Sequence, residues 1–239
     1  MQYLDLTLAR PEENLACDEA LLDACEEGEA PPILRFWEPR QAFVVLGYGN
    51  KIQTEVNVDF CEQNWIPILR RCTGGGTVLQ AAGCLNYSLI LPISPEAGLD
   101  TVSATNRLIM SRNSEALAEL TRLPVHIQGF TDLSLNGLKF SGNSQRRRKN
   151  SLLFHGSFLL SADISLIEKT LALPTKQPDY RQNRSHADFL TNLNVSAAEL
   201  KAALRKIWGA SQLFTDFRHD RVTALCREKY DLDAWNRKF

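Results

Sequence analysis

The segment Asp132-Leu-Ser-Leu-Asn-Gly-Leu-Lys-Phe-Ser-Gly-Asn-Ser144 decides the fold class of this 239-residue chain. Its Asn136-Gly137 pair lies between two short apolar runs, which is the strongest local signal for a β-hairpin. We therefore predict strands at 132–135 and 138–140. Because strands joined by so tight a turn run antiparallel, the segment argues against a sheet made only of parallel strands.

Strands and helices are interleaved on both sides of this hairpin. Apolar runs predict further strands at 2–6, 33–37, 43–46, 66–70, 86–91 and 152–160. Helical periodicity and end signals predict helices at 12–26, 58–64, 108–123, 165–173, 197–208 and 218–230. Since several strands follow one another through short turns, we expect an α+β fold with a mixed, mostly antiparallel sheet flanked by helices. No linker or repeat interrupts the pattern, so residues 1–239 are expected to form a single domain.

The bulk composition excludes some classes of partner. The chain is 44% hydrophobic and 23% charged, and its formal net charge is −1. Such a balance creates no strong field for nucleic acid or a membrane surface, so neither is an expected partner. No apolar run reaches the ~18 residues of a membrane span, and Met1–Arg10 does not resemble a signal peptide. A cytoplasmic location is the resulting expectation, in which most of the six cysteines are buried thiols.

A glycine-rich stretch, Arg70-Arg71-Cys72-Thr73-Gly74-Gly75-Gly76-Thr77-Val78, is the first candidate for ligand binding. Three residues without side chains let a backbone approach a ligand closely and offer it several N–H groups. The preceding arginines suit a phosphate or a carboxylate. A flexible turn between strands is the plain alternative, and the glycine spacing matches neither a Walker loop nor a dinucleotide fingerprint.

Two strand segments supply further candidates. Lys139 alternates with apolar neighbours and is followed by small residues, so a ligand could lie within reach of its ammonium group. The alternative is an ordinary solvated lysine. His155-Gly156-Ser157 sits in the next predicted strand, where a lone histidine is more often structural than catalytic.

Taken together, these segments resemble the lipoate-protein ligase branch of the biotin/lipoate protein ligase superfamily. Arg70–Val78 is similar to that family's lipoate-binding loop, and Lys139–Gln145 is similar to its "Lys-x-Ser-Gly-x-Ala-x" motif. His155-Gly156-Ser157, with Leu159-Leu160, is similar to its "His-Gly-Thr-x-Leu" strand. The resemblance spans nearly the whole chain and implies a class II synthetase-like catalytic domain.

The resemblance also implies an activity and a site. It implies ATP-dependent activation of lipoate (or octanoate) to an acyl-adenylate, then transfer to a lysine of a lipoyl carrier domain. Expected carriers are 2-oxoacid dehydrogenase E2 subunits or the glycine cleavage H protein. Lys139 is the implied catalytic residue, and Asp132 the implied Mg²⁺ ligand. The full set implied to bind ligands is Arg70, Arg71, Gly74, Gly75, Gly76, Thr77, Val78, Leu79, Asn86, Asp132, Lys139, Ser141, Gly142, His155, Gly156 and Ser157.

The chain departs from the family pattern in three respects. Gln80 and Ala81 stand where the family usually has histidine and often aspartate after the glycine loop. The further small C-terminal domain of single-chain ligases is not expected here, which leaves open a separate accessory subunit or a reaction without adenylation. Octanoyl transferases of this fold use a cysteine shortly before the lysine motif, but residues 125–140 contain none.

Two other functions therefore stay open. The first is an ATP-independent octanoyl or lipoyl transferase, for which Cys72, beside Arg71, or Cys84 would be the nucleophile. The second is a non-catalytic module that binds an acyl ligand or a lipoylated partner. The basic run Arg146–Lys149 is expected to be a solvated loop, with steering of acidic carrier domains as the alternative.

Overall fold

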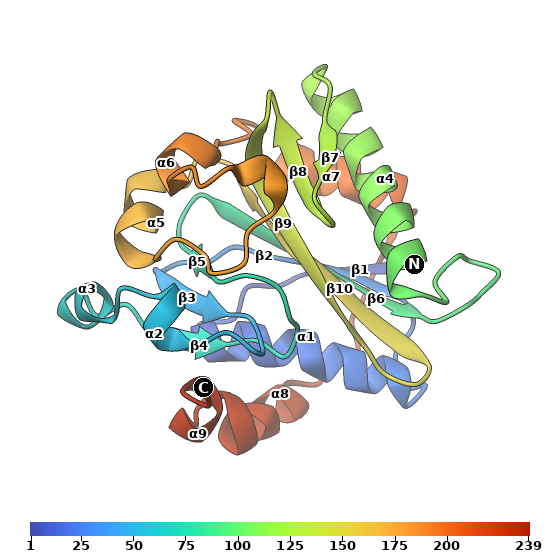
Figure 1. The fold of residues 1–239 in the computed structure, drawn as a ribbon. Helices are drawn as coiled ribbons and strands as arrows, with labels where there is room; N and C mark the ends of the chain where they lie inside the picture. Colours follow the sequence, from blue (N-terminus) through green and yellow to red (C-terminus); the bar gives the residue numbers. More distant parts are fainter.

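The computed structural model describes residues 1–239 and is built around an eight-stranded sheet (Figure 1). The order of its strands is β11-β1-β2-β6-β10-β9-β8-β7. Their bounds are β1 Gln2–Asp5, β2 Ile33–Trp37, β6 Cys84–Pro92, β7 His126–Gln128, β8 Asp132–Leu135, β9 Leu138–Arg147, β10 Ser151–Leu159 and β11 Gln212–Leu213. Only the β11-β1-β2 edge is parallel, which confirms the predicted mixed, mostly antiparallel sheet.

A second, three-stranded sheet has the order β4-β3-β5 and carries the glycine-rich segment. Its strands are β3 Phe43–Leu46, β4 Ile68–Arg70 and β5 Val78–Gln80. β4 runs parallel to β3, and β5 runs antiparallel to it. The triple glycine therefore lies in the connection between the two outer strands of the small sheet. We did not predict β5, because three residues are too short to show a strand period.

Helices cover both faces of the large sheet (Figure 1). Helix α4 and helix α7 pack against one face, while α1 and then α8 lie across the other. The helices are α1 Pro11–Glu26, α2 Ile52–Glu55, α3 Val58–Gln63, α4 Val102–Thr121, α5 Ile164–Thr170, α6 His186–Phe189, α7 Ala197–Ile207, α8 His219–Leu225 and α9 Asp233–Asn236. One 3₁₀ turn spans Asp179–Arg181, and one π-helical turn spans Cys226–Tyr230.

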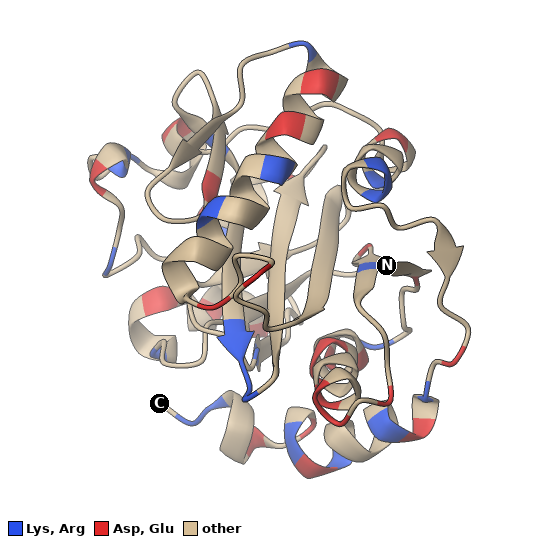
Figure 2. Ribbon diagram, turned by 90° about the vertical axis from the view of Figure 1, so that its right-hand side faces the viewer, with Lys and Arg blue, Asp and Glu red and all other residues tan.

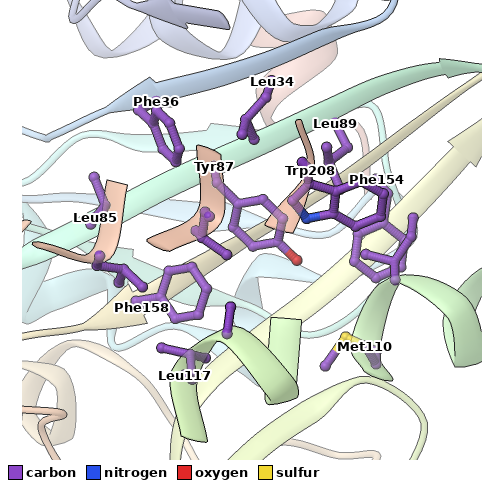
Figure 3. Packing of buried hydrophobic residues seen from close by; sticks show 14 of the residues in the cluster. Leu34, Phe36, Leu85, Tyr87, Leu89, Met110, Leu117, Phe154, Phe158 and Trp208 are labelled. Atoms are coloured by element: carbon purple, nitrogen blue, oxygen red, sulfur yellow. The ribbon is translucent and has the colours of Figure 1, made fainter. Parts of the chain in front are cut away.

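Each face of the large sheet has its own hydrophobic core. Aromatic residues of the central strands, including Tyr87, Phe154 and Phe158, pack under α4 and α7 (Figure 3). On the other face, Leu15 and Leu22 of α1 pack over Ile90 of β6. Burying a side chain of this size contributes about 1.5–3 kcal/mol, so the two cores together hold the central strands rigidly. The polar residues described below stand on this rigid support.

The hairpin that decided the fold class is confirmed. Asn136 and Gly137 both have positive φ, 51° and 76°, as a two-residue turn of this type requires. Strand β9, however, continues well beyond Phe140 because its pairing with β10 reaches Arg147 opposite Leu152. The length of that strand was therefore underestimated.

The basic run is not the solvated loop that we expected. Arg146 donates to the carbonyl oxygen of Cys72 at 2.9 Å, and Arg147 donates to that of Leu99 at 2.7 Å. Arg148 forms an ion pair with Asp23 of α1 at 2.6 Å. Figure 2 shows these basic residues at the end of a strand, while most other charged residues lie on helices and loops. No helix of the structure is long and apolar enough to cross a membrane.

Candidate active site

A row of mostly polar residues crosses the centre of the large sheet on its α1 face. Trp37, Asn86, Ser157, Gly142 and Asp132 lie directly opposite one another on five successive strands. Because directly paired residues of antiparallel strands point to the same face, their side chains share one surface. The indole N–H of Trp37 and the hydroxyl of Ser157 are buried without a hydrogen-bond partner. Unpaired buried polar groups are costly, so this row is suited to contact with a polar ligand.

Lys139 reaches this same surface at the Asp132 end of the row. Its Nζ lies 2.8 Å from Oδ1 of Asp132, and the hydroxyl of Tyr180 donates to Oδ2 of Asp132 at 2.7 Å. A β-carbon at Gly142 would lie 2.8 Å from the same Nζ, so the glycine leaves the room that the ammonium group occupies. The side chain of Lys139 is about one-quarter exposed. A positive charge is thus held at the edge of the sheet surface and remains accessible.

Arg71 organises the glycine loop from inside. Its guanidinium donates to the carbonyl oxygens of Gly74 at 2.6 Å and Gly76 at 2.7 Å, and to the hydroxyl of Thr73 at 2.9 Å. No carboxylate pairs with it. Burial lowers the pKa of Arg71 to about 10, which leaves it protonated at neutral pH. The loop therefore encloses a cation that no acid of the protein neutralises.

The three glycines of the loop have different structural roles. Gly75 has a φ of +84°, and a β-carbon there would meet Arg71 and Ser144. Gly74 and Gly76 have no such φ, and a β-carbon on either would meet no atom within 4 Å. The fold therefore requires glycine at position 75 only. The other two glycines leave open space beside the Arg71 cation.

Thr73, at the start of the loop, joins the loop to the large sheet. Its hydroxyl lies 2.7 Å from Nε2 of His155 on β10 and accepts from the hydroxyl of Ser144 on β9 at 2.9 Å. His155 in turn contacts Asp18 of α1 through Nδ1, at 2.9 Å. Since Ser144 and Gly142 are alternate residues of β9, the loop and the ammonium group of Lys139 lie on the same face of the sheet.

Arg70 occupies a different environment from Arg71. Its side chain is fully buried and donates to five backbone carbonyl groups at 2.8–3.2 Å. These carbonyls belong to Gly47, Tyr48, Asn50, Trp235 and Asn236. None of these carbonyls belongs to the glycine loop, so Arg70 holds the C-terminal segment onto the turn after β3 and is not placed in the proposed ligand set.

Of the remaining predicted residues, Asn86 lies on this surface, whereas Ser141 and Gly156 pair with Leu133 and Tyr87 of the opposite core and face away from it. Asn86 and Gln80 exchange two amide hydrogen bonds of 2.8 Å, so the unusual Gln80 fills its position by pairing within the protein. Thr77 contacts the side chain of Asn50 at 2.9 Å, and Val78 and Leu79 form β5. Ser141 is buried in β9. Gly156 gives room to Asn143, whose side-chain oxygen a β-carbon would overlap.

Several residues of the site were not among the predicted ones. Thr73 and Ser144 lie inside the quoted motifs but were not selected. The sequence around a hydroxyl group does not indicate which residue it will bond to in the fold. Asp18 lies on α1, within the predicted helix 12–26, and was not selected. Tyr180 lies in the segment between α5 and α6, which reaches back over the hairpin. These contacts join residues 48 to 137 positions apart, so no local pattern could have revealed them.

The chemistry of the donors limits which metal sites are available. No group of three or more histidine, cysteine, aspartate or glutamate side chains is arranged to hold a metal ion. Asp132 contributes one carboxylate, already in contact with Lys139 and Tyr180. A single carboxylate fits Mg²⁺ only where phosphate oxygens and water complete the shell, as is common for this ion.

None of the six thiols is activated. Five are buried and Cys25 is half-buried. Burial raises the pKa of Cys72 to about 12, despite the nearby cations Arg146 and Lys229. Burial also raises the pKa of Cys84. A thiolate nucleophile needs a lowered pKa, so neither residue has the environment of one.

A separate cavity lies away from this surface. It has a volume of about 440 Å³ and is lined by residues of β1, β2 and α7, among them Tyr3, Glu38 and Lys201. Lys201 is engaged there by Asp5 at 3.0 Å and Glu38 at 2.7 Å. The charged groups of this cavity therefore neutralise one another, whereas the Lys139 ammonium group remains accessible.

The fold and site place the chain among enzymes that activate or transfer acyl groups. Residues 10–206 match the family model described as "Lipoyl protein ligase A/B catalytic domain". The chain therefore belongs to this family, as the sequence motifs indicated. Its members include ligases and acyltransferases, so the chain is an enzyme of the ligase/acyltransferase kind.

Named relatives of both kinds match over most of the chain. Octanoyltransferase LipM of Geobacillus kaustophilus is 28% identical, covering 99% of this chain and 98% of the relative. Lipoate-protein ligase A subunit 1 of Thermoplasma acidophilum is 29% identical, covering 93% and 90%. A solved structure of lipoate-protein ligase A bound with ATP superposes with a TM-score of 0.79 at 25% identity, covering 99% of each chain. The expected catalytic-domain fold is confirmed.

Proposed function

We propose that this protein is a lipoate-protein ligase that activates lipoate (or octanoate) with ATP and transfers the acyl group to a lysine of a lipoyl carrier domain. One observation carries the proposal. The ammonium group of Lys139 and the glycine loop around Arg71 stand on one face of one sheet, linked through Ser144. The partly exposed Lys139 ammonium group and the buried Arg71 guanidinium thereby place positive charge beside the space where we propose that an acyl phosphate forms.

The open glycines support an extended ligand beside the loop. Gly74 and Gly76 are not needed for the backbone conformation or for packing. Their lack of side chains therefore suits a ligand that passes close to the backbone. We propose that an acyl chain of lipoate type passes along this exposed backbone, with its carboxyl end toward Lys139. Ser157, with its unpaired buried hydroxyl, lies opposite Gly142 and can donate to the same carboxyl group.

The proposed chemistry needs positioning and charge, not a covalent intermediate on the protein. Attack of carboxylate on phosphorus, and then of an amine on the acyl carbon, both build negative charge on oxygen. Lys139 donates to that oxygen. The N–H groups of the glycine loop and the positive charge of Arg71 further stabilise the negative charge. The protonated, buried thiols are consistent with a reaction that forms no thioester on the protein.

ATP and Mg²⁺ are the cofactors of this proposal. Asp132 would hold Mg²⁺ on one side, while the nucleotide phosphates would complete its shell. Bound Mg²⁺ would neutralise phosphate charge. Asp132 would otherwise orient Lys139, and Tyr180 fixes the second carboxylate oxygen of Asp132.

The carrier and any accessory subunit belong to the proposal as well. E2 subunits of 2-oxoacid dehydrogenases and the glycine cleavage H protein are the carriers to test. One relative is named as subunit 1 of its ligase, so that enzyme's name implies a further subunit. The present chain is proposed to catalyse acylation itself, with a separate subunit as a partner that raises its rate.

A second candidate function is ATP-independent octanoyl transfer between carrier proteins. It is favoured by the relatives named octanoyltransferase, which match along almost the whole chain at 25–28% identity. The thiol environments described above favour the ligase. A module that binds acyl ligands without turnover is the third alternative.

One experiment separates these functions. The protein is incubated with apo carrier domain and either lipoate, ATP and Mg²⁺ or octanoyl carrier protein, and carrier mass is followed. The ligase predicts acylation in the first mixture, with pyrophosphate release even without carrier. Acylation only in the second mixture would establish the transferase, and acylation in neither would favour the binding module. Asp132→Asn should raise the Mg²⁺ concentration needed for pyrophosphate release.

A further inference from the structure

The Thr73 hydroxyl makes more hydrogen bonds than a surface hydroxyl would. It accepts from Nε of Arg71 at 2.9 Å and from the hydroxyl of Ser144 at 2.9 Å. It also lies 2.7 Å from Nε2 of His155. Thr73 is 1% exposed, so water does not compete for these bonds. All hydrogen-bonding positions of this hydroxyl are therefore used within the protein.

The hydrogen bonds determine where the proton of His155 lies. A hydroxyl oxygen has two acceptor positions and one proton. Arg71 and Ser144 occupy both acceptor positions, so Thr73 must donate to Nε2 of His155. Nε2 is then unprotonated, and Nδ1 carries the proton and donates to Oδ2 of Asp18 at 2.9 Å. The imidazole is held in a single tautomer by its two neighbours.

Asp18 is a fixed anchor for this chain of bonds. It is 2% exposed, and its other contacts are the guanidinium of Arg35 and the hydroxyl of Ser88. Burial alone would raise the pKa of Asp18, but Arg35 and His155 outweigh burial and hold the pKa below its usual value. The carboxylate therefore stays ionised and immobile at the base of the site.

We propose that Asp18 and His155 are positioning residues. Through Thr73, they hold the start of the glycine loop against Ser144 on the strand that carries Lys139. This positioning role of His155 is separate from the direct ligand contact expected from its motif. Only the kinetic part of the test rests on the proposed function, because tautomer and loop attachment are properties of the free protein.

The tautomer is tested by ¹⁵N NMR of histidine-labelled protein at pH 8, with His155→Gln used to assign the signal. We expect His155 to show a protonated Nδ1 and an unprotonated Nε2. Asp18→Asn should weaken this preference. If the single variant fails to fold, Arg35→Met is added, because it removes the buried guanidinium that Asp18 neutralises. A protonated Nε2 in the unaltered protein would overturn the proposal.

Loop attachment is tested with a matched set of threonine variants. Thr73→Val removes the hydroxyl and keeps the shape, Thr73→Ser restores the hydroxyl, and Thr170→Val makes the same change at a buried threonine of α5. The amide of Tyr48 donates to the carbonyl of Thr73 and reports on the loop. Its hydrogen exchange should accelerate about tenfold in Thr73→Val, since tenfold corresponds to the loss of about one hydrogen bond.

The control measurements make the result decisive. Exchange of the Tyr48 amide should return to normal in Thr73→Ser and be unchanged in Thr170→Val. With lipoate as substrate, KM should rise about tenfold in Thr73→Val with a smaller change in kcat, as expected for a displaced binding loop. An unchanged Tyr48 exchange rate in Thr73→Val would refute the positioning role. If Tyr48 exchange accelerates in Thr73→Val as predicted but the unaltered protein does not turn over lipoate, the proposed function fails and the positioning role stands.

Discussion

Gly47 lies directly against the carbonyl group of Gly75, and a β-carbon at position 47 would overlap its oxygen. The contact joins the turn after β3 to the centre of the triple glycine. The amide of Tyr48 also donates to the carbonyl of Thr73 at 2.8 Å, so the two loops form one unit. The position of the glycine loop thus depends on a glycine outside the glycine run.

Gly47→Ala should therefore displace the glycine loop and lower kcat/KM for lipoate by at least about tenfold, since small displacements of a positioned group reduce rates strongly. Gly49→Ala is the matched control, because a β-carbon there meets no atom within 4 Å. The measurement is steady-state carrier acylation, with thermal unfolding of both variants. Equal kinetics of the two variants would show that the Gly47–Gly75 contact does not position the loop.

Lys139→Ala should reduce acyl transfer by about 100- to 1000-fold, as expected for removal of a charge that stabilises a developing oxyanion. Lys201→Ala removes a lysine of similar exposure that pairs with Asp5 and Glu38 at the remote cavity. It should keep near-normal activity. Carrier acylation by mass spectrometry is the assay, and a Lys139→Ala variant with full rate would remove this residue from the catalytic assignment.

Cys72→Ala should retain activity within about threefold, both with lipoate plus ATP and with an octanoyl carrier as donor, since a buried protonated thiol is not a nucleophile. Alkylation at pH 7 should label Cys25 first, the one cysteine that is not fully buried. Loss of octanoyl transfer in Cys72→Ala, with the fold intact, would revive the thiol mechanism.

His186 predicts an acid-sensitive component of stability. Burial, with help from Arg181, lowers the pKa of His186 to about 4 from 6.5. Between pH 6.5 and 4, His186 is protonated in the unfolded chain but not in the folded protein. The contribution of His186 to the free energy of unfolding is therefore complete above pH 6.5 and is lost as the pH falls toward 4. The loss amounts to about 3 kcal/mol at most, from 1.36 kcal/mol per pKa unit.

The contribution of His186 is isolated by denaturant unfolding of the unaltered protein and of His186→Gln at pH 7.0, 5.5 and 4.5. The free energy of unfolding should fall less steeply in the variant over this range. Parallel pH profiles of the two proteins would show that His186 is not the residue responsible. The pKa of Asp18 is lowered in the folded protein, so this residue also stabilises the fold. Its contribution to the free energy of unfolding is lost only at lower pH, because the unfolded pKa of aspartate is near 4.

Arg70→Ala should act on stability and not on chemistry. It would leave five backbone carbonyl groups, two of them in buried hydrogen bonds, without their donor, at a cost of about 3 kcal/mol. Its melting temperature should fall markedly, while kcat for the folded fraction stays near normal. A normal melting temperature with a large rise in KM for ATP would return Arg70 to the ligand set.

Much of the fold could be predicted because its signals are local. The Asn136-Gly137 turn, the bounds of β2 and β3, and helix α1 all follow from neighbouring residues. Short elements such as β5 and β7 were not predicted, since three residues are too few to show a strand period. The start of α4 was placed too late, because its N-terminal turn is stabilised by a cap at Thr101 more than by an apolar stripe.

The site was predictable to the extent that its residues stand inside continuous motifs. Lys139, Arg71 and the three glycines could be selected because residue type and spacing suggest a ligand. The different roles of these residues could not be predicted from the motifs. Only the structure distinguishes Arg71, inside the ligand loop, from Arg70, which binds the C-terminal segment.

By itself, the amino-acid sequence determined the class of fold and the family, and it predicted the two segments proposed to carry the ligand chemistry, because turn signals, periodicity and motif spacing are short-range properties. The tertiary structure alone decided which hydroxyl, carboxylate and glycine meet at the site. Asp18, Thr73 and His155 come from a helix, a loop and a strand, and 55 and 82 positions separate them along the chain. Such meetings depend on the packing of the whole sheet, since hydrogen bonds act over about 3 Å in space whatever the separation in sequence.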